Sequence, residues 1–450
     1  MKKRRRFTMK TLKTIGLLIV VFFLASGLSW SNGLNLNSLG TRALTMGGAF
    51  VGLADDFSAI FWNPAGAAFF NQQYFGFYGT DLIPSSTYEM TINVPGVGPF
   101  TLVDAKTKRK HYLGGMAAYY RPLTPNVVAG FGIYTPSGLG ADWNGADFAA
   151  ISNDNASLKW RSKIGLVTFS PLIAVKLTDQ ISLGATFNIN YGLFDIAMHA
   201  GSAEVPLPVP PYVMEVDLGQ YEESMKGWGY GATFGVLMRP SDMFSFGATV
   251  KTASTVKFKG DASISKLGLL GANSTSDVER EVTWPMWVAA GLALRPMPDL
   301  TLTADVQWTQ WSKLDTMHTD FKDPFWQVMM AASGDDERPL YWKDTTQIRF
   351  GAEYKLRTVA LRAGYYYDPS PSPAKTMNVL LPSYDFNVFT LGLGYSLDGL
   401  QIDMGIEYLM GKEREVPYEK TLLDPEYEAA MPGIYNMTLI VPNLSISYKF

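Results

Sequence analysis

Apolar and polar residues alternate along much of this chain, which is the pattern of β-strands with two unlike faces. In 400–410 the side chains of Leu400, Ile402, Met404, Ile406 and Tyr408 share one face, and polar or small residues occupy the other. Successive side chains of a strand point to opposite sides, so such a strand has one apolar face. The predicted strands are 73–82, 111–121, 126–136, 159–177, 180–198, 227–239, 243–260, 281–295, 300–312, 345–356, 359–367, 384–396, 400–410 and 436–450.

The connections between these strands alternate between short and long. Short turns such as 121–125, 178–179 and 397–399 are separated by segments of about a dozen residues or more. Short periplasmic turns and long external loops are typical of outer-membrane barrels, and an even strand count places both termini on the periplasmic side. We therefore predict an all-β fold, a 14-stranded antiparallel transmembrane β-barrel in the outer membrane.

The last strand ends in an aromatic residue. Leu444, Ile446, Tyr448 and Phe450 alternate with polar side chains up to the end of the chain. A terminal aromatic on an amphipathic strand resembles the signal that the outer-membrane assembly machinery reads, so we expect that machinery to be a partner.

The first 31 residues have the organisation of a signal peptide. A strongly basic start is followed by an apolar run from Ile15 to about Leu28. A transmembrane anchor, the alternative, needs about 20 apolar residues, and polar Ser29 and Ser31 come too soon. We expect cleavage after Ser31, with Gly27 as the alternative.

Charge and cysteine content exclude several functions. The signal region holds seven of the 38 basic residues and none of the 41 acids, so the chain without it carries a net charge near −10. Nucleic acid is therefore not an expected partner, because phosphate binding needs a basic face. The chain has no cysteine, which removes thiolate metal sites and thiol nucleophiles. We expect no cofactor and no metal.

Residues 32–72 are predicted to form a hatch inside the lumen of the barrel, 73–450. Sixteen to 18 strands leave an open channel and eight fill with side chains, so 14 leave a bore that needs a blocker. Asp55 or Asp56 is suited to capping a short helix at 57–62, which Pro64 ends. Gly47 and Gly48 permit tight turns. The alternative, a separate periplasmic domain, is too small to fold readily by itself.

The stretch 40–65 resembles the N-terminal hatch of the FadL/TodX family, outer-membrane channels for long-chain fatty acids and related hydrophobic molecules. Its most specific part is Asn63-Pro64-Ala65, and weaker similarity is seen at 227–231, 301–312 and 342–354. The resemblance covers most of the mature chain. It implies a 14-stranded barrel whose hatch residues here are Arg42, Gly47, Gly48, Asp55, Asp56, Asn63, Pro64 and Ala65.

The resemblance also implies a route for the ligand. An external hydrophobic groove captures the ligand, which then moves to a site near the mature N-terminus and leaves sideways through a kink in the third strand. The apolar residue of that inner site is Leu34 here, where the better-known pattern has an aromatic. Outer segments diverge most within the family, so the residues of the external groove do not carry over.

The third predicted strand ends in residues that disturb strand pairing. Pro136, Gly138 and Gly140 follow its alternating part. Proline cannot donate to a strand ladder, and glycines mark bulges and bends. These residues are the candidates for a lateral opening. The alternative is that they simply end the strand and begin a loop.

Strand alternation points four cations into the lumen: Lys251, Arg349, Lys355 and Arg362. They are suited to pair with a fatty-acid carboxylate, or else with the inward-facing acids Asp305, Glu353 and Glu407.

Enzyme chemistry is not expected. A phospholipase needs a nucleophile beside a base, and the three histidines, His111, His199 and His318, lie at strand ends or in loops with no nucleophile motif near them. We expect a monomeric channel for passive uptake of hydrophobic molecules, long-chain fatty acids foremost, with the outer-membrane lipid as its surroundings. A channel for monoaromatic hydrocarbons and a general porin remain the alternatives.

Overall fold

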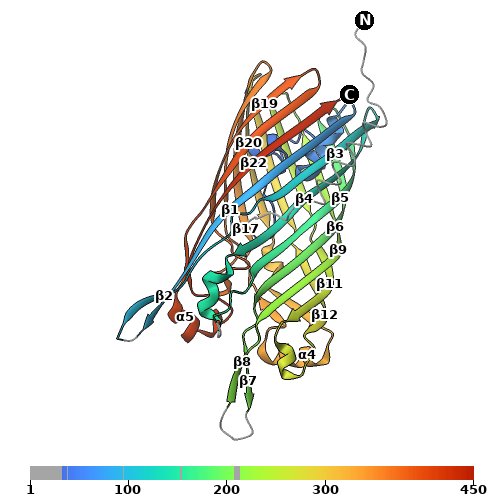
Figure 1. Ribbon diagram of the computed structural model, residues 1–450. Coiled ribbons are helices and arrows are strands. Elements are labelled where there is room, and N and C mark those ends of the chain that lie inside the picture. Colours follow the sequence, from blue (N-terminus) through green and yellow to red (C-terminus); the bar gives the residue numbers. More distant parts are fainter. Residues whose placement is uncertain (1–32, 38, 95, 153–154, 207–212) are drawn as a thin grey trace.

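Long antiparallel strands close into a barrel in the computed structural model, which describes residues 33–37, 39–94, 96–152, 155–206 and 213–450 (Figure 1). The wall closes where β1 pairs with β22, from Tyr74 opposite Lys449 to Glu89 opposite Ile434. The predicted 14-stranded antiparallel barrel is confirmed. In pairing order the wall consists of β1 (Tyr74–Val94), β2 with β3 (Gly98–Lys106, Tyr112–Thr124), β4 (Val127–Trp143), β5 (Trp160–Lys176), β6 (Ile181–His199), β9 (Gln220–Met238), β10 with β11 (Phe244–Lys251, Ser254–Ile264), β12 with β13 (Thr275–Trp284, Trp287–Met297), β14 (Leu300–Thr309), β17 (Thr345–Leu356), β18 (Val359–Asp368), β19 (Phe386–Leu397), β20 (Leu400–Gly411) and β22 (Gly433–Lys449).

The two faces of the wall differ as the alternation predicted. On β20 the apolar Met404 and Ile406 are exposed on the outside, whereas Asp403 and Glu407 are buried inside. Lipid chains solvate the outer face of a membrane barrel, so apolar side chains belong there. No helix among the described residues is long and apolar enough to cross a membrane.

The two ends of the barrel differ in the length of their connections. The end that carries the chain terminus has short turns, and the opposite end carries the long loops (Figure 1). The predicted signal peptide, 1–31, lies outside the described residues. The loop elements are η2 (Gly145–Ile151), β7 (Ser202–Pro206), β8 (Val213–Asp217), η3 (Leu267–Leu270), η4 (Trp311–Lys313), β15 (Thr316–Phe321), α4 (Pro324–Ser333), β16 (Glu337–Pro339), η5 (Ala374–Thr376), β21 (Arg414–Val416), α5 (Tyr418–Leu423) and η6 (Pro425–Tyr427).

Several strands differ from their predicted bounds. The first was expected to end at residue 82, but β1 continues to Val94 because β2 folds back on it as a hairpin. The strand predicted at 281–295 is divided between β12 and β13 at Pro285-Met286. Proline has no N–H for the ladder, which accounts for that break. The strand predicted at 300–312 ends at Thr309, before the 3₁₀ turn η4.

The described residues from 39 to 72 lie within the barrel and are almost entirely buried. They form α2 (Thr41–Thr45), α3 (Ala59–Trp62) and η1 (Pro64–Phe69), which we call the hatch together with their connections. Its apolar side chains pack against inward-facing residues of the wall such as Tyr78 and Met116. A second apolar cluster fills the half of the lumen nearer the long loops.

Candidate functional site

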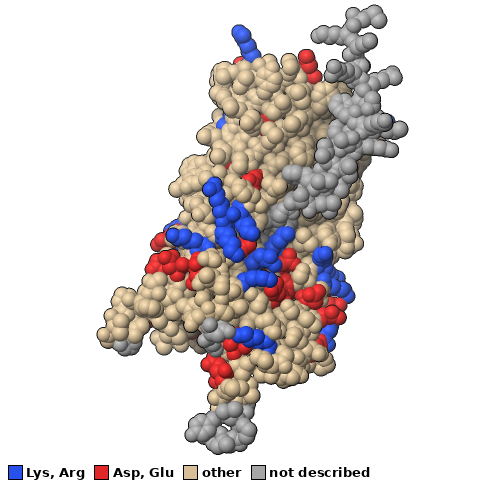
Figure 2. Space-filling model, in the orientation of Figure 1, with Lys and Arg blue, Asp and Glu red and all other residues tan. Residues whose placement is uncertain are grey.

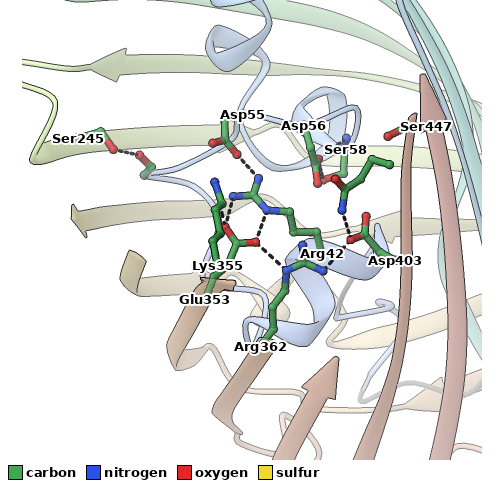
Figure 3. A network of polar contacts seen from close by, with 12 residues as sticks. Arg42, Asp55, Asp56, Ser58, Ser245, Glu353, Lys355, Arg362, Asp403 and Ser447 are labelled. Atoms are coloured by element: carbon green, nitrogen blue, oxygen red, sulfur yellow. Dashed lines mark hydrogen bonds and ion pairs between the residues drawn. The ribbon is translucent and has the colours of Figure 1, made fainter. Parts of the chain in front are cut away.

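The hatch is held to the wall by a buried network of charges around Arg42 (Figure 3). Nε of Arg42, on α2, donates to Glu353 of β17 at 2.7 Å, and Nη2 donates to the other carboxylate oxygen at 2.9 Å. Nη1 of Arg42 pairs with Asp55. Arg362 of β18 binds both Glu353 and Asp403 of β20 at 2.7 Å. The network therefore joins the hatch to three wall strands.

The two acidic residues of the hatch have different environments. Burial raises the pKa of Asp55, but the Arg42 guanidinium more than offsets that effect and holds the pKa below its ordinary value. Burial raises the pKa of Asp56 to about 6, since Arg42 and the hydrogen bond from Ser58 compensate only in part. Asp56 accepts from the Ser58 N–H at 2.7 Å and thereby holds the turn before α3. The helix begins at Ala59, two residues later than predicted.

The segment Asn63-Pro64-Ala65 links the hatch to itself and to the wall. The Asn63 amide donates to the carbonyls of Val51 and of Val236, on β9, at 2.9 Å each. The Ala65 N–H donates back to the Asn63 side chain at 3.1 Å. Extended backbone at Asn63 ends α3 ahead of Pro64, as the proline predicted. The motif thus fixes the orientation of the hatch.

Inward-facing glycines of the wall make room for this close approach. A Cβ at Gly235 would lie 2.1 Å from Oδ1 of Asn63, and one at Gly364 would lie 2.0 Å from the Gly47 nitrogen. Gly47 and Gly48 have φ of 64° and 65°, the left-handed turn predicted for them. The wall glycines that face the hatch in this way are Gly76, Gly132, Gly184, Gly235, Gly247, Gly291, Gly351, Gly364, Gly392 and Gly405.

The wall is interrupted between β3 and β4. Their pairing ends with Met116 opposite Tyr134, and the pairing of β4 with β5 has a bulge between Tyr134 and Ser137. Contact resumes near the loops, where Thr107 forms a bridge with Trp143. The interruption contains Pro136, Gly138 and Gly140, the three candidates for a lateral opening.

Residues before the hatch lie behind this interruption. The Leu36 N–H donates to the Pro136 carbonyl at 2.9 Å, and the Ser137 hydroxyl donates to the Leu34 carbonyl. Leu34 and Leu36 are both buried. The segment 34–37 therefore occupies the space where the resemblance placed the inner ligand site. Sequence reasoning named Leu34 but missed Leu36, which lies deeper beside the hatch.

A small cavity beside Leu36 brings two of the four predicted cations together, Lys251 of β10 and Arg349 of β17. Nζ of Lys251 lies 5.3 Å from the Phe61 ring centroid. The Arg349 guanidinium lies over the rings of Trp62 and Tyr366. Among the described residues neither cation forms an ion pair. By contrast, Lys355 and Arg362 pair with Glu353, at 3.7 and 2.7 Å.

A larger cavity of about 440 Å³ lies toward the long loops. Its apolar walls include Trp160, Leu380 and Met431, and Arg338 of β16 lies at its edge. Its Nη2 donates to the Met198 sulfur at 3.9 Å, and within the described part of the chain the guanidinium forms no ion pair. No pattern in the sequence indicated Arg338, because β16 is a three-residue strand inside a loop.

The outer cavity also contains a charge pair that is already satisfied. Arg280 of β12 binds the Glu223 carboxylate with both Nη atoms, at 2.7 and 2.9 Å. The side chains of both residues are buried. Such bidentate pairing leaves little capacity for another anion, so the free cation of this cavity is Arg338 as far as the described residues go.

At the opposite end, a polar cavity of about 370 Å³ is lined by the Arg42 network together with Lys355 and Lys449. The two larger cavities among the described residues therefore lie at opposite ends, the more apolar one near the long loops and the more polar one near the short turns. The hatch lies between them.

Comparison with known proteins gives a consistent assignment. The family model described as outer membrane protein transport protein (OMPP1/FadL/TodX) matches residues 22–450. A long-chain fatty acid transport protein of Escherichia coli O6:H1 is 23% identical over 90% of this chain and 92% of its own length. Outer membrane protein P1 of Haemophilus influenzae is 22% identical over 91% of this chain and 92% of its own length.

Solved structures agree in fold. A Pseudomonas aeruginosa FadL homologue superposes with a TM-score of 0.72 at 18% identity, covering 93% of this chain and 100% of its own. The Pseudomonas putida toluene transporter TodX superposes with a TM-score of 0.70 at 17% identity, with the same coverage of both chains. The chain therefore belongs to the OMPP1/FadL/TodX family of outer-membrane transporters for hydrophobic molecules.

Proposed function

We propose that this protein takes up long-chain fatty acids across the outer membrane by passive diffusion. The ligand binds first in the outer cavity beside Arg338. It then displaces the segment 34–37 from the inner site and leaves through the interruption between β3 and β4. Its own gradient drives the transfer.

The observation that carries this proposal is a pair of cations beside the interruption, of which Arg349 is buried and Lys251 is partly buried. Charged groups within a membrane protein are costly unless they are paired or serve a function. Lys251 and Arg349 form no ion pair with any described residue, and they lie with Leu36 and Pro136 around one cavity. A carboxylate bound there would satisfy both cations while its alkyl chain contacted apolar side chains.

Lateral exit is supported by the free energy of wetting an alkyl chain. Each buried CH₂ contributes about 0.8 kcal/mol, so a chain of some sixteen carbons would lose on the order of 10 kcal/mol in the aqueous periplasm. A route through the wall into the membrane avoids that loss. Pro136 lacks an N–H and its carbonyl is taken by Leu36, so β3 and β4 are not joined there by a ladder.

Uptake of a monoaromatic hydrocarbon is the second candidate, favoured by the close structural likeness to TodX. Such a ligand has no charge and gains nothing from Lys251 or Arg349. The two functions therefore differ in whether transport depends on these cations. A general porin is disfavoured because the hatch, whose residues are almost all buried, fills the lumen.

The test compares Lys251→Met with Lys355→Met in a host that lacks its own fatty-acid uptake protein. Both changes remove one lysine charge, but Lys355 is half exposed and paired with Glu353. We expect Lys251→Met to reduce growth on oleate and uptake of labelled oleate at least about tenfold, since a charged hydrogen bond contributes roughly 1.5–3 kcal/mol. Lys355→Met should change uptake less than about twofold, as expected for an exposed pair.

Toluene entry, measured in the same cells, separates the candidates. Oleate uptake that depends on Lys251, with toluene entry unchanged, supports the fatty-acid function. Growth on toluene but not on oleate for the unchanged protein supports the hydrocarbon channel instead. Entry of small polar solutes, with neither oleate nor toluene transported, would support the general porin instead.

A further inference from the structure

A cluster of basic residues lies on the outer surface of the barrel, next to the interruption in the wall. The stretch 106–110 joins β2 to β3 and reads Lys-Thr-Lys-Arg-Lys, with no acidic residue. All four of its cations are exposed. Figure 2 shows Lys and Arg side chains gathering on this face of the wall, where β2 continues into β3.

Strand register brings two further cations to the same surface. The Lys108 N–H donates to the Asp142 carbonyl of β4 at 2.8 Å, and Asp142 lies opposite Arg161 of β5. Lys163 follows two positions along β5, on the same outward face. We call these six residues the basic cluster: Lys106, Lys108, Arg109, Lys110, Arg161 and Lys163.

The positive charges of the cluster exceed its acidic partners. Asp142 takes ion pairs from both Lys108 and Lys110, each at 3.1 Å. Lys106, Arg109, Arg161 and Lys163 form no ion pair with a residue that the structure describes, although Asp195 of β6 lies opposite Lys163. The lysines farther around the wall differ: Lys257 pairs with Glu281 at 2.9 Å, and Lys259 and Lys322 are also paired with acids. An excess of cations on a membrane-facing surface needs anions from outside the protein.

The position of the cluster indicates which anions are available. β2 and the far end of β4 lead into the long loops, so the cluster lies toward the external leaflet. Farther down the same face the outward side chains are apolar, with Phe131 and Ile173 about half exposed. A lipid with several phosphates above its acyl chains fits this arrangement, because phosphates pair with Lys and Arg while the chains contact the apolar wall.

We propose that the basic cluster binds the phosphorylated glycolipid of the outer leaflet, through the phosphates of its lipid A part. The bound lipid lies beside the interruption between β3 and β4, and its acyl chains cover the wall below the cluster. A carboxylate leaving through the interruption is a weaker fit, because one carboxylate carries a single charge and the cluster holds four cations without ion pairs among the described residues. This inference does not depend on the transported substrate.

The test measures binding of lipid A to the full-length barrel in detergent by native mass spectrometry. The variant carries Arg109→Gln, Arg161→Gln and Lys163→Gln, which removes three cations that have no ion pair among the described residues. The matched control carries Lys257→Gln, Lys259→Gln and Lys322→Gln, which removes three cations that each have an acidic partner. The probes are bisphosphorylated lipid A, dephosphorylated lipid A and oleate. A shift in gel mobility on heating confirms that each barrel is folded.

We expect the variant to bind bisphosphorylated lipid A at least about tenfold more weakly, since each basic residue near an anionic surface contributes roughly a fivefold factor. The control should change less than about twofold, and dephosphorylated lipid A should not distinguish the proteins. Arg109→Lys with Arg161→Lys, which keeps both charges, should bind normally. Equal binding by the variant and the unchanged protein would overturn the proposal. A loss confined to oleate would also overturn it, by assigning the cluster to a departing carboxylate.

Discussion

Arg42 and Glu353, 311 residues apart in the chain, form a bidentate pair with N–O distances of 2.7 and 2.9 Å. Their side chains are 11% and 0% exposed. Such a pair joins the hatch to β17 with both charge and geometry, since a guanidinium matches the two oxygens of a carboxylate. The pair is therefore a buried, bidentate connection between the hatch and the barrel wall.

Replacing Arg42 should loosen the hatch. Arg42→Met leaves Asp55 without its principal partner and removes one of the two guanidinium groups on Glu353. Loss of one partner of a buried pair costs about 3–5 kcal/mol. We expect higher and noisier single-channel conductance in planar bilayers, with the heat-modifiable shift of the barrel retained. Lys355→Met, at an exposed partner of the same carboxylate, is the control; conductance that rises equally in both variants would contradict this role.

The hatch should also become less stable as the pH rises from about 4 to 7. Burial raises the pKa of Asp56 to about 6, above its ordinary value of 3.8, with Arg42 opposing and Asp55 adding to the shift. Because the pKa of Asp56 is higher in the packed hatch, protonation stabilises the packed hatch fully at pH values below the ordinary pKa of 3.8. That stabilisation is lost as the pH rises through about 6. The difference is about 3 kcal/mol at most. Conductance should rise over this range, and Asp56→Asn should flatten the profile. An unchanged profile in that variant would assign the titration to another group.

The glycines of the wall should be as necessary for holding the hatch in place as the buried charges are. A Cβ at Gly235 would lie 2.1 Å from the Asn63 side chain, so Gly235→Ala forces the hatch or β9 to move. Overpacking of this kind typically costs about 1–3 kcal/mol. Ala232→Val on the lipid-facing side of the same strand is the control. We expect higher protease sensitivity of the hatch in Gly235→Ala alone, read by mass spectrometry of the fragments. Equal protection in both variants would mean that the hatch is not seated on this glycine.

Strand alternation was sufficient to predict the wall. β20 has one apolar face throughout and β22 has one from Ile440 to Tyr448, and lipid contact requires that face to point outward. Alternation could not reveal the continuation of β1 beyond residue 82, because Pro84, Ser85 and Ser86 interrupt the apolar pattern there. Backbone pairing with β22 and β2 holds that part of β1 in place.

Strand alternation alone could not show which of the four inward cations are paired with an acid. Arg362 lies directly opposite Glu353, which explains its ion pair. Lys251 lies opposite Thr233 and Trp287, so its register offers no acid. Arg349 lies opposite Asp305, but that carboxylate instead accepts the Val51 N–H of the hatch at 2.7 Å. Register and hatch contacts, which the sequence does not display, decide which cations stay available.

Closing the wall interruption should stop transport. The chain has no cysteine, so Leu113→Cys with Gly138→Cys introduces a single pair, one residue on each side of the interruption. Bifunctional thiol reagents of increasing length should join the two strands and reduce oleate uptake several-fold, while binding of oleate at the outer cavity persists. Each single-cysteine variant, treated with the same reagents, controls for modification. Full uptake with the cross-link formed would exclude this exit and favour a path through the hatch.

Arg338 should determine the capture of carboxylate ligands at the outer cavity. Its guanidinium lines a cavity of about 440 Å³ whose walls are partly apolar and also include Asp335 and Glu337, but no acid of the described chain forms an ion pair with it. We expect Arg338→Met to weaken binding of oleate to purified protein about tenfold, since a charge-assisted hydrogen bond contributes roughly 1.5–3 kcal/mol.

Binding of oleyl alcohol, which has the same chain without the charge, should change little in Arg338→Met. Arg338→Lys should restore part of the affinity, because it keeps the charge but loses the bidentate geometry. Isothermal titration calorimetry at low detergent concentration measures the affinity of the unchanged protein, Arg338→Met and Arg338→Lys for each ligand. If oleate and oleyl alcohol lose affinity equally, Arg338 contributes through packing, and the cavity selects by hydrophobic contact alone.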